Sequence, residues 1–250
     1  MKPTYSGKTI VIIGGASGIG RECALLFAQH GGNVFIADWN IVEAEKTVEA
    51  IQKDGFKAKA EKLDITDSKN VERYFNSFIT IDILVNAASV LVLKDAIETT
   101  IEEWLRLISI NLTGTFIACK YAITAMKKAN KGGSIINFSS STGNYDAAPN
   151  SVAYVSSKGG VTLLTKALAS DYAKYGIRIN AVAPGPTDTA MIRECMSDSE
   201  LERLQSTLPT RKFGHPRDVA NVVLFLASEE ASFINGAIIA VDGGQTAKIS

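Results

Sequence analysis

Short apolar runs alternate with amphipathic stretches along most of the chain. The apolar runs are rich in Val and Ile and show little polar alternation, which is typical of strands covered on both faces of a parallel sheet. The stretches between them carry apolar residues at helical spacing. We therefore expect strands near residues 8–13, 33–37, 57–63, 81–85, 134–138, 177–182 and 237–241, and helices near 18–30, 41–51, 71–78, 101–128 and 151–174.

This regular succession of strands and helices predicts an α/β protein. The expected architecture is a single-domain doubly wound Rossmann-type fold with a seven-stranded, mainly parallel sheet. No internal repeat, low-complexity tract or linker divides the chain, so residues 1–250 are expected to form one dinucleotide-binding and catalytic domain. The longest stretch without a predicted strand is 183–236, and we expect a substrate lid at about 186–215.

Composition and charge narrow the classes of partner. The 26 Lys and Arg residues equal the 26 Asp and Glu residues, so no net field draws the chain to nucleic acid or anionic lipid. No signal core follows Met1, and no apolar run reaches the length of a membrane span. Cys23, Cys119 and Cys195 are widely spaced, which predicts neither disulfides nor a metal site. We expect a cytoplasmic protein without a membrane or nucleic-acid partner.

The first predicted strand runs directly into a glycine-rich turn that opens a helix. Residues 14–20 read Gly-Gly-Ala-Ser-Gly-Ile-Gly. Glycines at such a turn let backbone N–H groups approach a pyrophosphate at the positive end of the helix. The turn predicts a dinucleotide site whose contacts come from Gly14, Ser17, Gly18, Ile19 and Gly20.

An acidic residue ends the second predicted strand. The Asp38 carboxylate there can accept hydrogen bonds from adenosine ribose hydroxyls and would repel a 2′-phosphate. Its neighbours Ser17 and Trp39 are not basic, so neither would pair with that phosphate. Asp38 and Trp39 therefore predict NAD as the cofactor, while a helix cap ahead of Asn40 is the alternative role for Asp38.

With these features the chain resembles the short-chain dehydrogenase/reductase family over essentially its whole length. The resemblance rests on seven motifs in the correct order: the glycine turn, an acid at Asp64, an Asn-Asn-Ala-Gly-like segment at residues 86–89, Asn111, a serine after the fifth strand, a Tyr-x-x-x-Lys motif, and a Pro-Gly segment at 184–189. It implies further cofactor contacts from Asp64, Ile65, Asn86, Ala87, Ala88, Pro184, Gly185, Thr187 and Thr189.

The same resemblance implies the catalytic residues Asn111, Ser140, Tyr154 and Lys158. Matching the flanking Phe138 and Gly143 selects Ser140 within a run of three serines, and Ser139 and Ser141 stay open as alternatives.

The chemistry of these residue types fits proton and hydride transfer. Tyr154 and Lys158 lie four residues apart, hence on one helix face. A nearby ammonium favours a phenolate, so Lys158 is expected to lower the pKa of Tyr154, the general acid/base. The family implies that Tyr154 and Lys158 also contact the nicotinamide ribose, that Ser140 orients the substrate oxygen, and that Asn111 supports a proton relay.

The sequence predicts an NAD-dependent oxidoreductase that acts on a small-molecule alcohol or ketone, and two alternatives stay open. One is a catalytically impaired nucleotide-binding regulatory protein of the same fold. The other is an NADP-linked ketoacyl-type reductase.

Three further expectations concern Ile13 with Ala87, Arg193, and two helices that are apolar on more than one face. Ile13 stands for a family threonine and Ala87 for a family asparagine, and we expect the two side chains to meet across neighbouring strands. Arg193 in the lid is a candidate for gripping a substrate anion, with a solvated charge as the alternative. Helices near 105–125 and 155–168 are apolar on more than one face, which predicts a homotetramer, with a dimer as the alternative.

Overall fold

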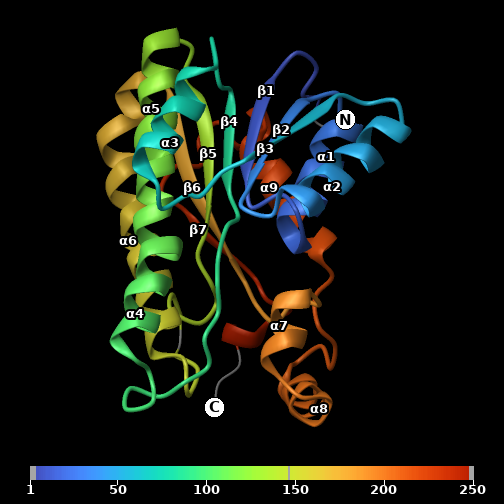
Figure 1. Ribbon diagram of the computed structural model, residues 1–250, viewed down its shortest axis with the longest axis vertical. Coiled ribbons are helices and arrows are strands. Elements are labelled where there is room, and N and C mark those ends of the chain that lie inside the picture. The colour runs from blue at the N-terminus through green and yellow to red at the C-terminus, as the bar shows by residue number, and fades with distance from the viewer. Residues whose placement is uncertain (1–3, 146, 248–250) are drawn as a thin grey trace.

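A seven-stranded parallel sheet forms the centre of the computed structural model, which describes residues 4–145 and 147–247. Its strand order is β3-β2-β1-β4-β5-β6-β7, and every neighbouring pair is parallel, as the continuous apolar runs predict (Figure 1). Residues 1–3, 146 and 248–250 of the expected domain lie outside the described residues. The strands are β1 (Thr9–Ile13), β2 (Asn33–Asp38), β3 (Ala58–Lys62), β4 (Ile83–Asn86), β5 (Gly133–Phe138), β6 (Ile177–Pro184) and β7 (Ile238–Val241).

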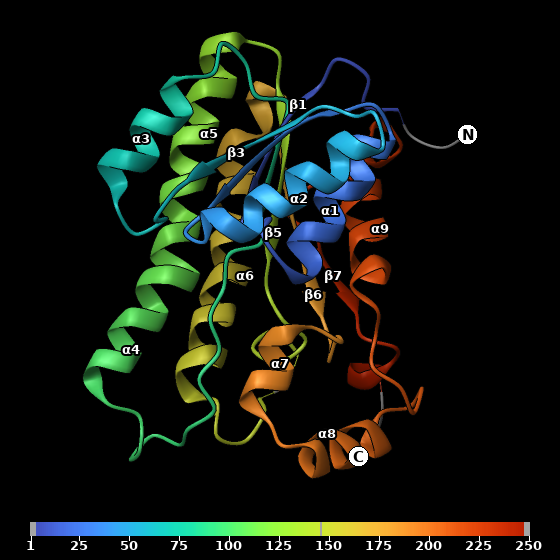
Figure 2. The ribbon, with the colours of Figure 1, turned by 45° about the vertical axis from the view of Figure 1, so that its right-hand side comes forward.

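Helices cover both faces of the sheet and bury two separate apolar clusters. One cluster joins the sheet to α1, α2 and α9, and the other joins it to α3, α5 and α6. Figure 2 shows these two layers on opposite sides of the strands. Burial on both faces explains why strands β1, β4 and β5 carry almost no polar alternation. The helices are α1 (Gly18–Gln29), α2 (Ile41–Lys53), α3 (Ser68–Asn76), α4 (Ile101–Ile108), α5 (Thr115–Ala129), α6 (Val152–Tyr172), α7 (Ala190–Cys195), α8 (Asp198–Thr207) and α9 (Pro216–Ala227).

The strand order reverses between β1 and β4. The chain proceeds from β1 to β2 and β3 on one side, and then returns to place β4 on the other side of β1. Connections therefore leave the carboxyl ends of β1 and β4 in opposite directions, the arrangement that creates a crevice in open α/β sheets. Ligands of open α/β sheets bind at such a crevice.

The expected contact between Ile13 and Ala87 is wrong. Ile13 is in register with Asn86, and partners in register share one face of a parallel sheet. Ala87 is one residue further along, so its side chain packs against the opposite cluster from Ile13. The two residues are joined instead by the backbone, because the Ala87 N–H donates to the Ile13 carbonyl at 2.8 Å.

Residues 101–129 form one continuous helical stretch that contains a π-helical turn. The turn η1 (Ser109–Gly114) separates α4 from α5. By length and composition alone this stretch could cross a membrane, but 44% of its most apolar window is buried inside the fold. Five fully or nearly fully buried residues of α5 pack in the second apolar cluster, which identifies a core helix: Ala118, Cys119, Ala122, Ile123 and Met126.

The predicted lid region is helical. Helices α7 and α8 follow β6 and lie beyond the carboxyl ends of the strands (Figure 1). The two ends of this region are joined to each other where Thr187 forms a backbone bridge with Gly214. Only Leu201 is buried in α8, and no residue of α7 is buried, so this region contributes little to the core.

Candidate active site

The glycine turn after β1 has the backbone shape that its sequence predicts. Gly14 and Gly18 have φ values of +82° and +52°, which other residues rarely adopt. A Cβ atom on Gly14 would lie 2.5 Å from the Ala88 backbone nitrogen, and a Cβ atom on Gly20 would collide with the Gly14 carbonyl. Glycine is therefore required both by conformation and by the close approach of β1, α1 and the loop after β4.

The start of α1 is open to an anion. Ser17 is exposed, precedes the helix, and its side chain makes no capping hydrogen bond. The first backbone N–H groups of α1 carry the positive end of the helix dipole. Thr189 adjoins this turn, because a Cβ atom on Gly18 would lie 3.3 Å from the Thr189 methyl carbon. These residues fit a pyrophosphate, and Ile19 is half-buried behind the turn.

Asp38 is held rigidly at the end of β2. Asp38 is buried, and its two carboxylate oxygens accept hydrogen bonds from the Ala16 and Asn40 N–H groups at 3.0 and 2.9 Å. The side chain that caps α2 belongs to Asn40, so the alternative role of Asp38 as that cap is wrong. Each carboxylate oxygen keeps accepting capacity for a ribose hydroxyl. Trp39 is 74% exposed beside it, where a large flat ligand can reach it.

The residues predicted on the adenine side differ in exposure. Asp64 is exposed, and one of its oxygens accepts hydrogen bonds from both the backbone N–H and the hydroxyl of Thr66. Ile65 is buried and packs against Gly114 of η1. Asn86 is buried in the sheet, and its amide donates to Asn137 at 2.8 Å. Asp64 is thus at the surface, whereas Ile65 and Asn86 are parts of the core.

The three consecutive serines after β5 face three different partners. Ser139 donates to the Lys158 carbonyl and pairs with Thr162 in the core. The Ser141 hydroxyl points to Gln245 at 3.4 Å. Ser140 is the serine that shares a side-chain hydrogen bond with Tyr154. The structure therefore brings Ser140, and neither neighbour, to the Tyr154 hydroxyl.

Burial controls the titration of the Tyr154–Lys158 pair. Desolvation raises the pKa of Tyr154, and the hydrogen bond from Ser140 lowers it only in part. Desolvation lowers the pKa of Lys158 to about 7. The Lys158 ammonium lies 5.6 Å from the Tyr154 ring centre and donates to the Phe138 carbonyl at 2.8 Å. The pKa of Tyr154 is therefore raised and not lowered as expected, because desolvation outweighs the lowering influence of the Ser140 hydrogen bond.

Asn111 lies in the π-helical turn, a feature that often marks functional sites. Its side chain is fully buried and is bonded to both the N–H and the carbonyl of Val90, at 2.8 and 2.9 Å. It also donates to the Ser157 hydroxyl at 3.2 Å. Asn111 therefore fastens the loop after β4 to α6. Ser157 was not predicted, although its place beside Lys158 in the Tyr-x-x-x-Lys motif was a usable signal.

The Pro184–Thr189 segment leaves β6 along the same edge. Thr187 is buried, and its hydroxyl donates to the Gly185 carbonyl at 2.9 Å. Gly185 packs so closely on the C-terminal turn that a Cβ atom there would lie 2.7 Å from the Asp242 Cβ. Gln245, which sequence reasoning missed, lies in that turn and accepts from Ser141.

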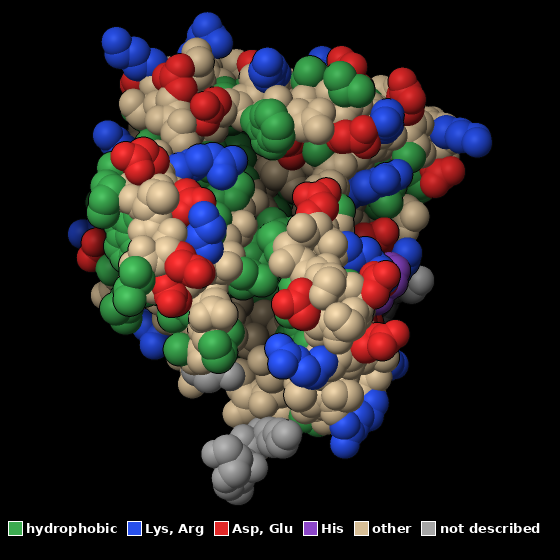
Figure 3. Space-filling view, turned by 60° about the horizontal axis from the view of Figure 1, so that its bottom comes forward, with side chains coloured by type: hydrophobic (Ala, Val, Ile, Leu, Met, Phe, Trp, Pro, Cys, Tyr) green, Lys and Arg blue, Asp and Glu red, His purple; other side chains and the backbone are tan. Residues whose placement is uncertain are grey.

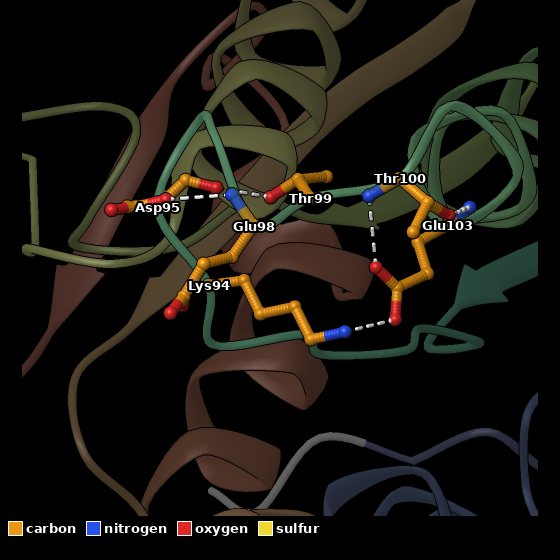
Figure 4. Close-up of polar contacts among 6 residues, drawn as sticks. All are labelled: Lys94, Asp95, Glu98, Thr99, Thr100 and Glu103. Atoms are coloured by element: carbon orange, nitrogen blue, oxygen red, sulfur yellow. Dashed lines mark hydrogen bonds and ion pairs between the residues drawn. The ribbon is translucent and has the colours of Figure 1, made fainter.

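A hollow opens at this end of the molecule. Figure 3 shows it with hydrophobic side chains on its floor and charges of both signs around its rim. The loop after β4 is joined to the start of α4 by the Lys94–Glu103 ion pair at 2.5 Å, where Glu103 also closes the capping box of α4 with Thr100 (Figure 4). Lys94 forms a backbone bridge with Ser151 at the start of α6.

The predicted lid region carries an exposed ion pair. Arg193 and Asp188 approach to 2.6 Å between Nε and Oδ1, with both side chains about half exposed. This pairing lowers the pKa of Asp188 through a hydrogen bond. Arg193 is therefore already paired, and a substrate anion would have to compete with Asp188.

Known proteins of the same kind are recognisable over almost the whole chain. Residues 14–246 match the family model described as enoyl-(acyl carrier protein) reductase. The chain is 38% identical to the cyclopentanol dehydrogenase of Comamonas sp. over 96% of this chain and 97% of that protein. It is 37% identical to the 3-oxoacyl-(acyl-carrier-protein) reductase FabG of Thermotoga maritima, over 95% and 97%.

The solved structures agree with the curated relatives. One is described as an NAD(P)-dependent gluconate 5-dehydrogenase from Beutenbergia cavernae with bound NADP at low occupancy; it superposes with a TM-score of 0.93 at 30% identity, over 98% of this chain and 99% of that one. Its fold and the sequence matches support the same conclusion. The chain belongs to the short-chain dehydrogenase/reductase family of nicotinamide-dependent oxidoreductases.

Proposed function

We propose that the protein is an NAD-dependent oxidoreductase that transfers hydride between the nicotinamide and a secondary alcohol or its ketone. The observation that carries the proposal is one cluster at the carboxyl edge of the sheet, in which Ser140 and Lys158 are buried and Tyr154 is half-buried. There Ser140 is bonded to Tyr154, and Lys158 lies on the same helix face beside them. The open N-terminus of α1 lies at the same edge, so a dinucleotide held there can extend toward this cluster.

The residues divide the work as follows. When bound, the nicotinamide supplies or accepts the hydride. In the reducing direction Tyr154 donates its hydroxyl proton to the substrate carbonyl oxygen, and in the oxidising direction it takes the proton of the alcohol. The raised pKa of Tyr154 keeps it protonated at neutral pH, which is the form needed for reduction. Ser140 donates a hydrogen bond to the same oxygen and stabilises its developing charge.

Lys158 and Asn111 support this step. Lys158 would hold the nicotinamide ribose hydroxyls together with Tyr154, and its pKa of about 7 lets it gain or lose a proton under working conditions. Asn111 anchors the loop after β4 against Ser157 and so supports a proton relay that starts at Lys158. In oxidation the relay passes to solvent the proton that Tyr154 gains, and in reduction it brings Tyr154 a replacement proton from solvent.

The preference for NAD rests on Asp38. Its fixed carboxylate suits two ribose hydroxyls and repels a 2′-phosphate. The second candidate is an NADP-linked ketoacyl-type reductase, which the resemblance to FabG and the NADP-containing structural neighbour favour. A comparison of kcat/KM for NADH and NADPH with one ketone decides between them. A higher value for NADPH would contradict the proposal.

A substrate panel tests the reaction itself. The relatives suggest cyclic secondary alcohols such as cyclopentanol and 3-oxoacyl thioesters as the two arms. Formation of NADH from NAD⁺ and an alcohol, measured by absorbance, is the expected result. Tight NADH binding without turnover on either arm would instead favour a nucleotide-binding regulatory protein.

The remaining proposals concern the assembly. Exposed apolar residues on α4, α5 and α6 support a homotetramer, which light scattering tests. These residues are Ile101, Leu105, Phe116, Val152 and Leu163.

The weakly buried residues 186–215 are proposed to close as a substrate lid over the bound cofactor. The unpaired cysteines and the absence of net charge support a cytoplasmic location.

A further inference from the structure

Ser89 occupies a fixed place at the crevice between β1 and β4. It comes three residues after Asn86, the end of β4. On its N-terminal side the backbone of Ala88 packs directly on Gly14 of the glycine turn. On its C-terminal side Val90 is held by two hydrogen bonds from Asn111. Ser89 therefore lies between the glycine turn and the anchor of the catalytic helix.

The hydroxyl of Ser89 is buried and has no hydrogen-bond partner within the described residues. Buried polar groups are nearly always paired, because leaving one unpaired forfeits its hydration without compensation. Ser134 shows the ordinary situation in this fold, since its buried hydroxyl donates to the Leu226 carbonyl. An unpaired hydroxyl at a ligand crevice points to a partner that arrives with the ligand.

We infer that the Ser89 hydroxyl binds an oxygen of the nicotinamide half of the dinucleotide, namely a ribose hydroxyl or its phosphate. The inference rests on the proposed dinucleotide binding. A pyrophosphate on the start of α1 places the adenine half over Asp38 and β2, on one side of the crevice. The nicotinamide half then extends across the end of β4 toward Tyr154 and passes Ser89.

This contact belongs to the chain itself and not to the family pattern. The family has glycine where this chain has Ser89, so the hydroxyl is an addition at the position. A serine retained without a folded-state partner lowers the stability of the empty protein, and it raises affinity once the partner is bound. The two effects have opposite signs, which separates a ligand role from a packing role.

The test measures affinity and stability on the same variants. Ser89→Ala removes the hydroxyl and keeps the carbon, and Ser134→Ala is the matched control with a buried hydroxyl that is already paired. For Ser89→Ala we expect NADH, followed by its fluorescence, to bind about tenfold more weakly, which corresponds to about 1.4 kcal/mol. AMP, which lacks the nicotinamide, its ribose and the phosphate attached to that ribose, should bind as to the wild type, and the melting temperature without ligand should be equal or higher.

Ser134→Ala should show the reverse pattern, with a lower melting temperature and unchanged NADH affinity. NADH affinity for Ser89→Ala within twofold of the wild type would overturn the inference, as would an equal loss of AMP affinity. Either result leaves the proposed function standing as long as the wild type binds NADH. Absence of NADH binding by the wild type would instead overturn the proposed function and this inference with it.

Discussion

The catalytic wall and the lid wall of the crevice are built in different ways. On the catalytic wall, β5 and α6 bury Ser140 and Lys158 and hold them with hydrogen bonds to neighbouring side chains or the backbone. On the lid wall, α7 buries no residue, and its Arg193 is held by one exposed ion pair. Buried groups that are hydrogen-bonded cannot move far without leaving polar atoms unpaired, whereas exposed ion pairs contribute little to the stability of the fold. The residues proposed for the chemistry thus lie on the rigid wall, and the proposed substrate lid forms the soft one.

The largest expected effect comes from the rigid wall. Tyr154→Phe keeps the ring but removes the proton donor, so turnover should fall by about 10²–10⁴-fold. NADH binding should stay within a small factor of the wild type, because only the hydroxyl is lost. Steady-state rates and a fluorescence titration measure the two quantities, and near-normal turnover in this variant would remove Tyr154 from the mechanism.

A comparison of two neighbouring serines tests which side chain of the same wall takes part in the reaction. Ser140→Ala removes the hydroxyl that contacts Tyr154, and kcat should fall by about 10²–10³-fold. Ser141→Ala is the matched control, since its hydroxyl faces Gln245, and its kcat should change much less. A greater loss in Ser141→Ala would show that the wrong serine has been assigned.

Burial of Lys158 makes stability depend on pH. Its pKa is about 7 in the folded protein against an ordinary 10.5, so between these values the unfolded chain binds a proton that the folded chain does not. The free energy of unfolding should therefore rise with pH from 7 to 10, by up to about 1.4 kcal/mol per pH unit. Below pH 7 this contribution levels off, because Lys158 is charged in both states.

Lys158→Met, which lacks the titrating group, is the reference for this effect. Denaturant unfolding of both proteins at several pH values isolates the contribution of Lys158 as the difference between the two curves. A constant difference between pH 7 and 10 would mean that the ammonium is not desolvated in the fold.

The smallest effect is expected on the lid wall. Arg193→Ala breaks the exposed pair with Asp188, and the melting temperature and kcat should both stay near those of the wild type. A change confined to KM for anionic substrates would show that Arg193 leaves Asp188 to bind them. A large fall in kcat for every substrate would contradict the division between a rigid and a soft wall.

The two walls also differ in how well sequence predicts them. The strand–helix succession, the glycine turn, Asp38 and the Tyr154–Lys158 spacing are local patterns, and the structure places each as expected. The raised pKa of Tyr154 was not predictable, since it depends on burial by distant segments. The flanking residues select Ser140 in the sequence but leave Ser139 and Ser141 open, and only the contact with Tyr154 in three dimensions separates the three serines.

Other differences have specific physical causes. The expected Ile13–Ala87 contact failed because it ignored the alternation of side chains along a strand, which the sequence does contain. The π-helical turn at Asn111 is invisible to a pattern based on 3.6 residues per turn. The lid carries no motif, and its short helices are set by local caps such as the Ser197–Glu200 capping box.

The central claim is tested most directly by measuring the transfer of labelled hydride from the alcohol to NAD⁺. The wild-type protein is incubated with NAD⁺ and secondary alcohols that carry deuterium on the carbinol carbon, and the reduced cofactor is examined by mass spectrometry. We predict that deuterium appears in the NADH formed by the wild type, and that Tyr154→Phe forms almost none. Binding of NADH without any deuterium transfer from the alcohols would contradict the account.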